Sequence, residues 1–204
     1  MTPADRPVHS LRERKQRRVR EAIVDAAYAL FAERGFDNVT VSDIAERAEV
    51  GRSTFFRYFG DKQEVVFADD QRGPTTDLAA LATPLPGRPI GDSLPAALAQ
   101  ARGLVLSFVE QLVLDPERYA VHEQLVAQHP ELQARSLVKL RKYAGLLAET
   151  LADRGADSGT SVLAAELAIA CYIAGHSATS GGAERLVHAV AAAFDRVTRT
   201  LSQT

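Results

Sequence analysis

Apolar residues recur with helical spacing through the first third of the chain. Between residues 19 and 35 they fall at i, i+3, i+4, i+7 and i+8, which predicts one apolar stripe on a helix that ends at Gly35. A shorter set with the same spacing runs from Val41 to Ala48, behind Thr40 as N-cap and Asp43 three residues later. The pattern therefore predicts two helices joined by a short turn. The first stripe comprises Ile23, Ala26, Ala27, Leu30 and Phe31.

A third helix is predicted after a sharp turn, with Gly51 as its N-cap. Phe55 and Phe59 lie one helical turn apart and are expected to pack against the first two helices rather than to contact a partner. The other positions of this helix are mainly polar, and Asp61 caps a further helix that begins near Lys62. Two short helices at this spacing are typical of a helix-turn-helix, whose second helix enters the DNA major groove.

The remainder of the chain predicts a larger helical body. Residues 73–95 hold five prolines and three glycines, which preclude a continuous helix and predict a boundary loop. From its length and position we expect this loop to cover the mouth of a pocket. Pro116 and Pro130 then mark two helix starts. With about nine helices and no convincing strand, the predicted fold class is all-α. The helices of the body are expected over residues 96–114, 116–128, 130–155, 161–178 and 182–202.

Three apolar surfaces in the body need partners. The helix at 130–155 carries a heptad-like series, residues 162–178 are apolar nearly all round, and the last helix has a broad stripe. The last two surfaces could pair with a second copy of the chain through helices 161–178 and 182–202, or they could form ordinary core within one subunit. The heptad-like series is Leu137, Leu140, Ala144, Leu147 and Leu151. The stripe of the last helix is Leu186, Val187, Val190, Phe194, Val197 and Leu201.

Charge is distributed unevenly along the 204 residues, although the formal net charge is only −2. Residues 10–20 combine six basic residues with the single acid Glu13. They are either a solvated tail or a flexible arm that follows phosphates or enters a minor groove. We therefore expect a basic arm over residues 1–14, a helix-turn-helix domain over 15–62, and an effector-binding and dimerisation domain over 63–204. The six basic residues are Arg12, Arg14, Lys15, Arg17, Arg18 and Arg20.

Several classes of site are not expected. The single Cys171 excludes an intramolecular disulfide, and no CxxC, His pair at ligand spacing or glycine-rich phosphate loop occurs, so neither a metal nor a nucleotide cofactor is predicted. The histidines are scattered and form no set of nucleophile, base and orienting group, which argues against an enzyme. Without an N-terminal leader or a long uninterrupted apolar run, the chain is expected to be cytoplasmic.

Residues 17–66 resemble the DNA-binding domain of the TetR family of transcriptional regulators. The pieces AAYALFAERGFDNVTVSDIAERAEV, GRSTFFRYF and DKQEVV follow one another in that family's order and spacing. The resemblance implies an all-helical homodimer that binds a palindromic operator through its N-terminal helices. It also implies a repressor, which a small molecule releases from the operator. It further implies that the two C-terminal helices of each subunit form a four-helix bundle.

Carried over to this chain, the resemblance places DNA contacts at the starts of three helices and along the recognition helix. The chain departs from the family at Phe56, where Tyr is common, at Tyr58, where His is frequent, and at Glu49, where Gly is frequent. A positive φ at Glu49 would strain the backbone. Arg52 is expected to read guanine, Thr40 to act as both cap and phosphate neighbour, and Lys62 to contact phosphate. The expected DNA-contacting residues are Arg17, Thr40, Ser42, Arg52, Ser53, Thr54, Phe56, Arg57, Tyr58 and Lys62.

Candidate effector contacts are aromatic, histidine and leucine side chains within otherwise apolar helices. Each of them could equally be core. Residues 118–155 also resemble the TetR branch with an acyl-CoA-like ligand-binding domain, in which Arg118, Arg135 and Arg141 would either meet an anion or form exposed salt bridges. The candidates are Phe108, Leu112, Tyr119, His122, Tyr143, Tyr172 and His176.

Two other classes remain open at this stage. Residues 63–204 could be a small helical enzyme or carrier-like module tethered to the helix-turn-helix domain. Alternatively, the three N-terminal helices could bind another protein. Operator binding would weaken steeply with salt and depend on sequence, whereas a protein-binding head need show neither.

Overall fold

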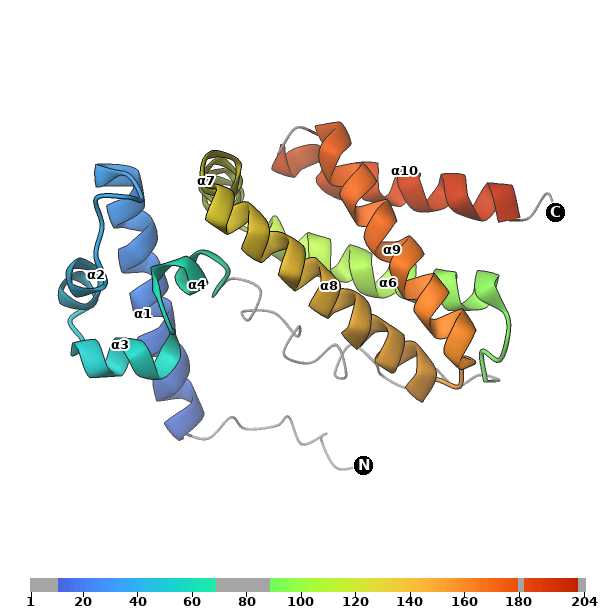
Figure 1. The fold of residues 1–204 in the computed structure, drawn as a ribbon, viewed down its shortest axis with the longest axis horizontal. Helices are drawn as coiled ribbons and strands as arrows, with labels where there is room; N and C mark the ends of the chain where they lie inside the picture. The colour runs from blue at the N-terminus through green and yellow to red at the C-terminus, as the bar shows by residue number, and fades with distance from the viewer. Residues whose placement is uncertain (1–10, 69–88, 180–181, 202–204) are drawn as a thin grey trace, which may run out of the picture. The chain divides into compact units, whose positions relative to one another are not determined.

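The computed structural model describes residues 11–68, 89–179 and 182–201 (Figure 1). Within these ranges the regular elements are nine helices and no strand, as the sequence predicts. The chain divides into two compact units, the head, Met1–Ala68, and the body, Asp69–Thr204.

The head contains α1 (Leu11–Arg34), α2 (Val41–Arg47), α3 (Arg52–Tyr58) and α4 (Lys62–Val66). Residues 11–14 are helical and belong to α1, which differs from the predicted flexible arm over residues 1–14, because Leu, Arg and Glu are good helix formers. The other part of that arm, residues 1–10, lies outside the described residues. The helix ends where predicted, at Gly35, whose φ of +76° suits glycine.

Buried aromatic rings hold the head together. Phe55 and Phe59 are almost fully buried with ring centres 5.8 Å apart, which confirms their expected place in the core. The Tyr28 hydroxyl of α1 donates a hydrogen bond to the Val66 carbonyl of α4, at 2.8 Å. Residues 65–68 are also buried, so the head extends to Ala68 rather than ending at the predicted residue 62.

Local capping sets the helix-turn-helix geometry. The Asp43 amide donates to Thr40 Oγ1 (3.2 Å) and the Thr40 amide donates to Asp43 Oδ2 (2.8 Å), which completes the predicted capping box of α2. Glu49 in the following turn has a φ of +53°, the positive value expected at this position. Gly51 and Asp61 occupy the N-cap positions of α3 and α4, also as predicted.

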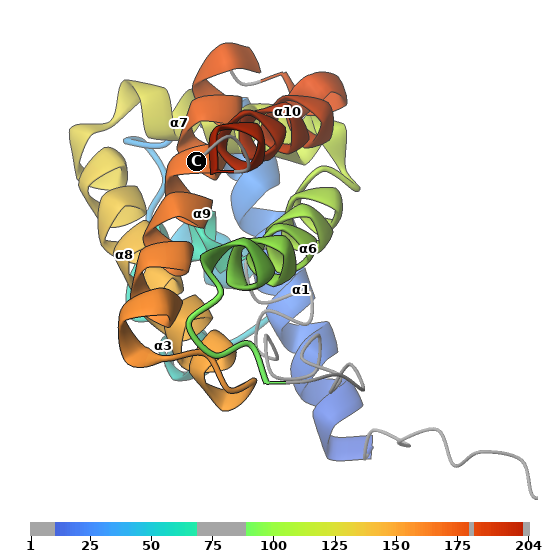
Figure 2. The same ribbon diagram turned by 90° about the vertical axis from the view of Figure 1, so that its right-hand side faces the viewer.

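The body contains α6 (Leu94–Leu112), α7 (Pro116–Gln128), α8 (Pro130–Asp153), α9 (Ser158–Thr179) and α10 (Ala183–Leu201). In Figures 1 and 2, α9 runs between α6, α8 and α10, and it packs against all three. The first of these helices starts earlier than predicted because Pro95 fits its first turn, where no amide donor is needed. Of the predicted 73–95 loop, residues 73–88 lie outside the described residues.

The apolar stripe of α10 packs within its own subunit. Leu186, Val190 and Phe194 are fully buried in the body core, and Val187, Val197 and Leu201 are half-buried against it. The sequence left a partner copy and the subunit's own core as alternatives for this stripe, and the subunit's own core buries its three central residues. On α8, Ala144, Leu147 and Leu151 are buried as the heptad-like series predicts, but Leu137 is exposed.

The central helix α9 combines buried small residues with an apolar outer side. Gly175 lets α10 approach closely, because a Cβ built there would lie 2.6 Å from Val190. Among the described residues, α9 is long and apolar enough to cross a membrane, and α6 with α7 would pass that test only as one span bent by 99°. Glu166 of α9 nevertheless pairs with Arg141 of α8, and the helix packs against α6, α8 and α10. Val162, Leu163 and Ile173 remain exposed on it.

Candidate functional site

Helix α3 presents one outward face built from the predicted DNA contacts. Arg52, Ser53, Phe56 and Arg57 are exposed, and Thr54 and Tyr58 are half-buried beside them. Phe55 and Phe59 fix the opposite side of the helix in the core. The structure therefore brings all six predicted contacts of this helix onto the accessible part of one short element.

The two arginines of this face differ in their surroundings. Among the described residues, no side-chain hydrogen bond or ion pair holds Arg52, so its planar guanidinium is available to a partner. The Arg57 guanidinium lies 5.4 Å from the centre of the Tyr58 ring, a cation–π arrangement that orients both side chains. Guanidinium groups in such a position suit bidentate contacts to guanine or to phosphate.

The DNA contacts predicted outside the recognition helix differ in exposure and in their internal hydrogen bonds. Thr40 and Ser42 are exposed at the start of α2, although the Thr40 hydroxyl is engaged in the capping box. The Lys62 ammonium donates to the carbonyls of Phe36 (2.7 Å) and Val39 (2.9 Å) and lies 4.4 Å from the Phe36 ring centre. Lys62 therefore ties α4 to the turn before α2, a structural role that the sequence pattern did not indicate.

The basic residues at the start of α1 form an exposed helical surface. Arg12, Arg14, Lys15, Arg17 and Arg18 are all exposed on the first two turns. Arg20 differs, because its guanidinium donates to the Ala68 carbonyl (3.0 Å) and lies 4.9 Å from the Phe59 ring centre. Its charge therefore supports the head core, and the other five remain candidates for phosphate contact.

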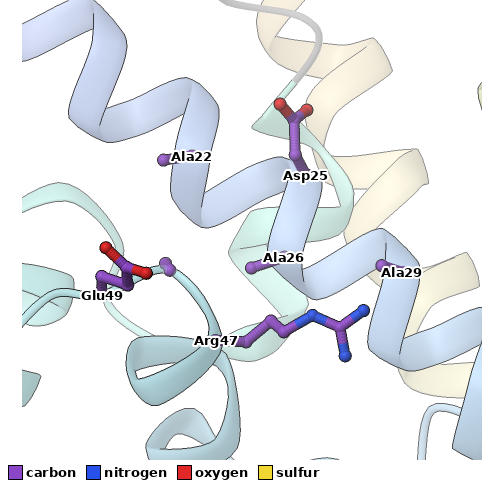
Figure 3. Close-up of a pocket in the computed structure, with 7 residues that line it drawn as sticks. Ala22, Asp25, Ala26, Ala29, Arg47 and Glu49 are labelled. Carbon is purple, nitrogen blue, oxygen red and sulfur yellow. The ribbon is translucent and has the colours of Figure 1, made fainter.

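A shallow hollow of about 420 Å³ opens on the head between α1 and the end of α2 (Figure 3). Its wall includes Arg47, which Glu33 holds through two hydrogen bonds of 2.7 and 3.1 Å and whose guanidinium lowers the pKa of that carboxyl. Asp25 and Glu49 add negative charge, so the hollow does not favour phosphate. The lining residues are Ala22, Asp25, Ala26, Ala29, Arg47, Ala48 and Glu49.

Four of the seven predicted effector contacts form a continuous series in the body, which we call the ring series: Tyr143 of α8, Phe108 of α6, and Tyr172 and His176 of α9. The Phe108 ring centre lies 5.7 Å from that of Tyr143 and 6.4 Å from that of Tyr172, and Tyr172 lies 6.0 Å from His176. All four side chains are half-buried, so part of each ring surface is accessible. The series joins three helices.

The sequence pattern missed Glu123 of α7, which lies at the end of the ring series. Its Oε2 is 2.5 Å from His176 Nε2, and this hydrogen bond raises the pKa of His176 despite burial that acts in the opposite direction. Tyr119, one turn earlier on α7, is 2% exposed, and its hydroxyl has no hydrogen-bond partner among the described residues. Burial, reinforced by the charge of Glu123, raises the pKa of Tyr119 and keeps its hydroxyl protonated.

The remaining candidates lie near the ring series without joining it. Leu112 packs against the body core one turn beyond Phe108, and His122 is half-buried on α7. Arg118 pairs with Asp115 at 3.5 Å and Arg141 pairs with Glu166, so both form salt bridges, the predicted alternative to anion binding, although the Arg118 side chain is largely buried. The third arginine, Arg135, is exposed.

Comparison with known proteins identifies related regulators. Residues 23–68 match the model for bacterial regulatory proteins of the tetR family. The chain is 35% identical over 147 residues to the HTH-type transcriptional regulator TcmR of Streptomyces glaucescens, covering 71% of this chain and 63% of that protein, which is less than two thirds of its length. It is 33% identical over 138 residues to the uncharacterized HTH-type transcriptional regulator YdeS of Bacillus subtilis, covering 64% and 68% of the two chains. A third relative is the putative mycofactocin biosynthesis transcriptional regulator MftR of Mycobacterium tuberculosis, 31% identical over 141 residues, with 69% and 68% covered.

Solved structures share the fold at lower identity. A complex of SmeT with triclosan aligns with a TM-score of 0.58 and 21% identity, covering 89% of this chain and 90% of that one. The fatty acid degradation regulator FadR from Bacillus halodurans aligns with a TM-score of 0.55 and 20% identity, covering 88% and 94%. At these identities the similarity establishes the architecture of a helix-turn-helix head with a helical body.

Proposed function

Because this chain belongs to the tetR family of bacterial transcriptional regulators and is a DNA-binding protein of that family, we propose that it is a repressor. In this proposal it binds a palindromic operator as a homodimer and is released by a small, largely hydrophobic effector. The observation that carries the proposal is the outward face of α3, whose polar and cationic groups are exposed while its two phenylalanines are buried.

In this proposal α3 enters the major groove. Arg52 reads a guanine through its O6 and N7 atoms, and the exposed Phe56 ring contacts a thymine methyl group. Tyr58 compensates for the hydroxyl that Phe56 lacks. Ser53, Thr54 and Arg57 reach neighbouring base edges or phosphates, and the start of α2, with Thr40 and Ser42, abuts the backbone. Lys62 has one proton beyond its two internal hydrogen bonds for a phosphate.

Phosphate attraction supplies the rest of the DNA affinity. The exposed basic start of α1, with Arg17 among its members, follows the backbone as a helix rather than as a flexible arm. Each lysine or arginine that neutralises a phosphate releases counterions, so affinity falls as salt rises.

The proposed dimer uses the exposed apolar side of α9. Leu163 and Ile173 are 49% and 44% exposed, large values for side chains of this kind near the centre of a bundle. The fully buried part of the α10 stripe is already used within the subunit, so α9 is expected to supply the larger share of the apolar interface. A two-fold arrangement of this kind presents two heads to two operator half-sites.

The proposed effector site is the ring series with Tyr119 and Glu123. It connects α6, α7, α8 and α9, so a ligand that alters these contacts changes how the helices of the body pack. Aromatic faces with a few polar groups are the composition of sites for largely apolar ligands.

The test begins with selection of operator DNA. Fragments retained by the purified protein are sequenced, and the enriched sequence is placed between a promoter and its start site for transcription in vitro. The proposal predicts two inverted half-sites and a decrease in transcript when the protein is added. Activation of transcription, or enrichment of no sequence, would contradict it. Transcription from the same promoter without the operator serves as the control.

A further inference from the structure

An unusual carboxylate lies at the end of the ring series. The Glu123 side chain is only 20% exposed, and its Oε2 atom is 2.5 Å from His176. In the described ranges no arginine or lysine pairs with Glu123, and its Oε1 atom accepts no hydrogen bond. A carboxylate in this position attracts cations and repels anions, because low exposure to water weakens screening.

The hydroxyl of Tyr119 is a second polar group without a partner. It lies one helical turn from Glu123, in a side chain that is 2% exposed. A buried hydroxyl without a hydrogen bond destabilises a protein by about 1–3 kcal/mol, so such groups are rare, and a ligand that supplies a partner recovers this free energy. Tyr119 stays protonated and can accept a hydrogen bond through its oxygen.

We propose that the effector carries a cationic amine attached to a flat aromatic body. This inference rests on the effector site proposed above. The amine donates to Oε1 of Glu123 and to the hydroxyl oxygen of Tyr119, and the aromatic body lies against Tyr172, Phe108 and Tyr143. An ammonium group has three donors, enough for both unpaired oxygen atoms, and its charge is attracted to the faces of the rings. A neutral hydrocarbon would leave both oxygens unpaired.

The same geometry disfavours an acyl-CoA-like effector. Its phosphates would approach a site whose Glu123 charge is balanced only by His176, and two of the arginines that could have met them are paired with Asp115 and Glu166. An amine that binds Glu123 also competes with His176 for the carboxylate. Binding therefore changes the hydrogen bond between Glu123 of α7 and His176 of α9, and through it the packing of these two helices.

The experiment compares two probes with the same ring system and opposite charge, 9-(aminomethyl)anthracene as its ammonium ion and anthracene-9-carboxylate. Their dissociation constants are measured by fluorescence titration with the full chain and with Glu123→Gln, which keeps shape and removes charge. We expect the wild-type chain to bind the cation at least tenfold more tightly than the anion, and Glu123→Gln to weaken the cation by about tenfold or more. The anion is expected to bind the variant as well as, or better than, the wild type.

Two controls make the result specific. Glu166→Gln removes a carboxylate that pairs with Arg141 on α8 and is expected to leave both dissociation constants unchanged. Tyr172→Leu removes one ring and is expected to weaken both probes, because the aromatic body is shared. Preference of the wild type for the anion, equal effects of Glu123→Gln and Glu166→Gln, or binding of neither probe would overturn the inference. None of these outcomes affects operator selection and repression, which test the regulator function separately.

Discussion

At the scale of single residues, Glu49 shows how a turn position constrains the head. Its φ of +53° lies in the left-handed region, which L residues with a Cβ atom enter at a cost of roughly 1–2 kcal/mol. The chain must adopt this conformation because the amide of Val50 donates to the Ala45 carbonyl, which closes the end of α2. A glycine would relieve the strain but would add flexibility to the unfolded chain.

We therefore expect Glu49→Gly to stabilise the head by about 0.5–1 kcal/mol. Glu46→Gly is the matched control, since Glu46 is exposed in the right-handed backbone of α2, where glycine destabilises by roughly 0.5–1 kcal/mol. Urea unfolding followed by circular dichroism measures both changes. Destabilisation by both variants to the same extent would refute the strain at Glu49.

Lys62 carries a second prediction at this scale. Replacing it by methionine keeps much of its volume but removes both hydrogen bonds to the carbonyls of Phe36 and Val39. The expected result is destabilisation of the head by about 1–3 kcal/mol, as for buried groups that lose their partners. Lys142→Met, at an exposed position of α8, should change stability by no more than about 0.5 kcal/mol. An unchanged urea midpoint for Lys62→Met would contradict the structural role of its two hydrogen bonds.

At the scale of elements, the hydrogen bond between Glu123 and His176 joins two helices of the body. The carboxylate raises the pKa of His176, so the folded state holds this proton more tightly than the unfolded chain does. The resulting stabilisation is complete below the pKa of an unfolded imidazole, about 6.5, and disappears as the pH rises through the folded value.

The wild-type chain is therefore expected to lose thermal stability relative to Glu123→Gln as the pH rises from about 6.5. The difference between their melting temperatures, measured in one buffer series, reports this loss. Glu166→Gln, which lacks a histidine partner, should show no such trend against the wild type. A difference that stays constant over the whole range would exclude charge on His176 as its cause.

Element boundaries were well predicted by sequence where local chemistry sets them. The structure confirms the predicted helix end at Gly35 and the predicted helix starts at Thr40 and Pro116. Each of these boundaries depends on the backbone preference or the side chain of the residue itself. Partner surfaces were harder to predict, because the apolar stripe of α10 does not indicate whether its own subunit or another copy covers it. Glu123 was missed for a similar reason, since its partner His176 is 53 residues away in sequence.

The surroundings of the proposed DNA contacts were predictable to a different degree at each position. The outward residues of α3 follow from helical spacing around Phe55 and Phe59, and all of them lie on the expected face. The internal contacts of Arg20 and Lys62 depend on carbonyls of distant segments, which no spacing in the sequence reveals. Charge alone therefore overestimated how many basic residues are available to phosphate.

At the scale of the whole molecule, the proposed binding to a palindromic operator requires a homodimer. Ile173→Glu places a charge on the exposed apolar side of α9 and is expected to shift the protein from dimer to monomer in light scattering at micromolar concentration. Val138→Glu is the matched control, because Val138 is also exposed, at 70%, but lies on α8. Monomeric wild-type protein, or an equal effect of both variants, would contradict the proposed interface.

The central claim is that the outward face of α3 reads DNA sequence. Its most direct test is the affinity of the wild type and Arg52→Ala for the selected operator and for random DNA, over a series of salt concentrations. We expect affinity to fall steeply with salt for both DNAs, and Arg52→Ala to lose about 1–3 kcal/mol on the operator with little change on random DNA. An equal loss on both DNAs, or no loss on either, would contradict the assignment of base reading to Arg52 and α3.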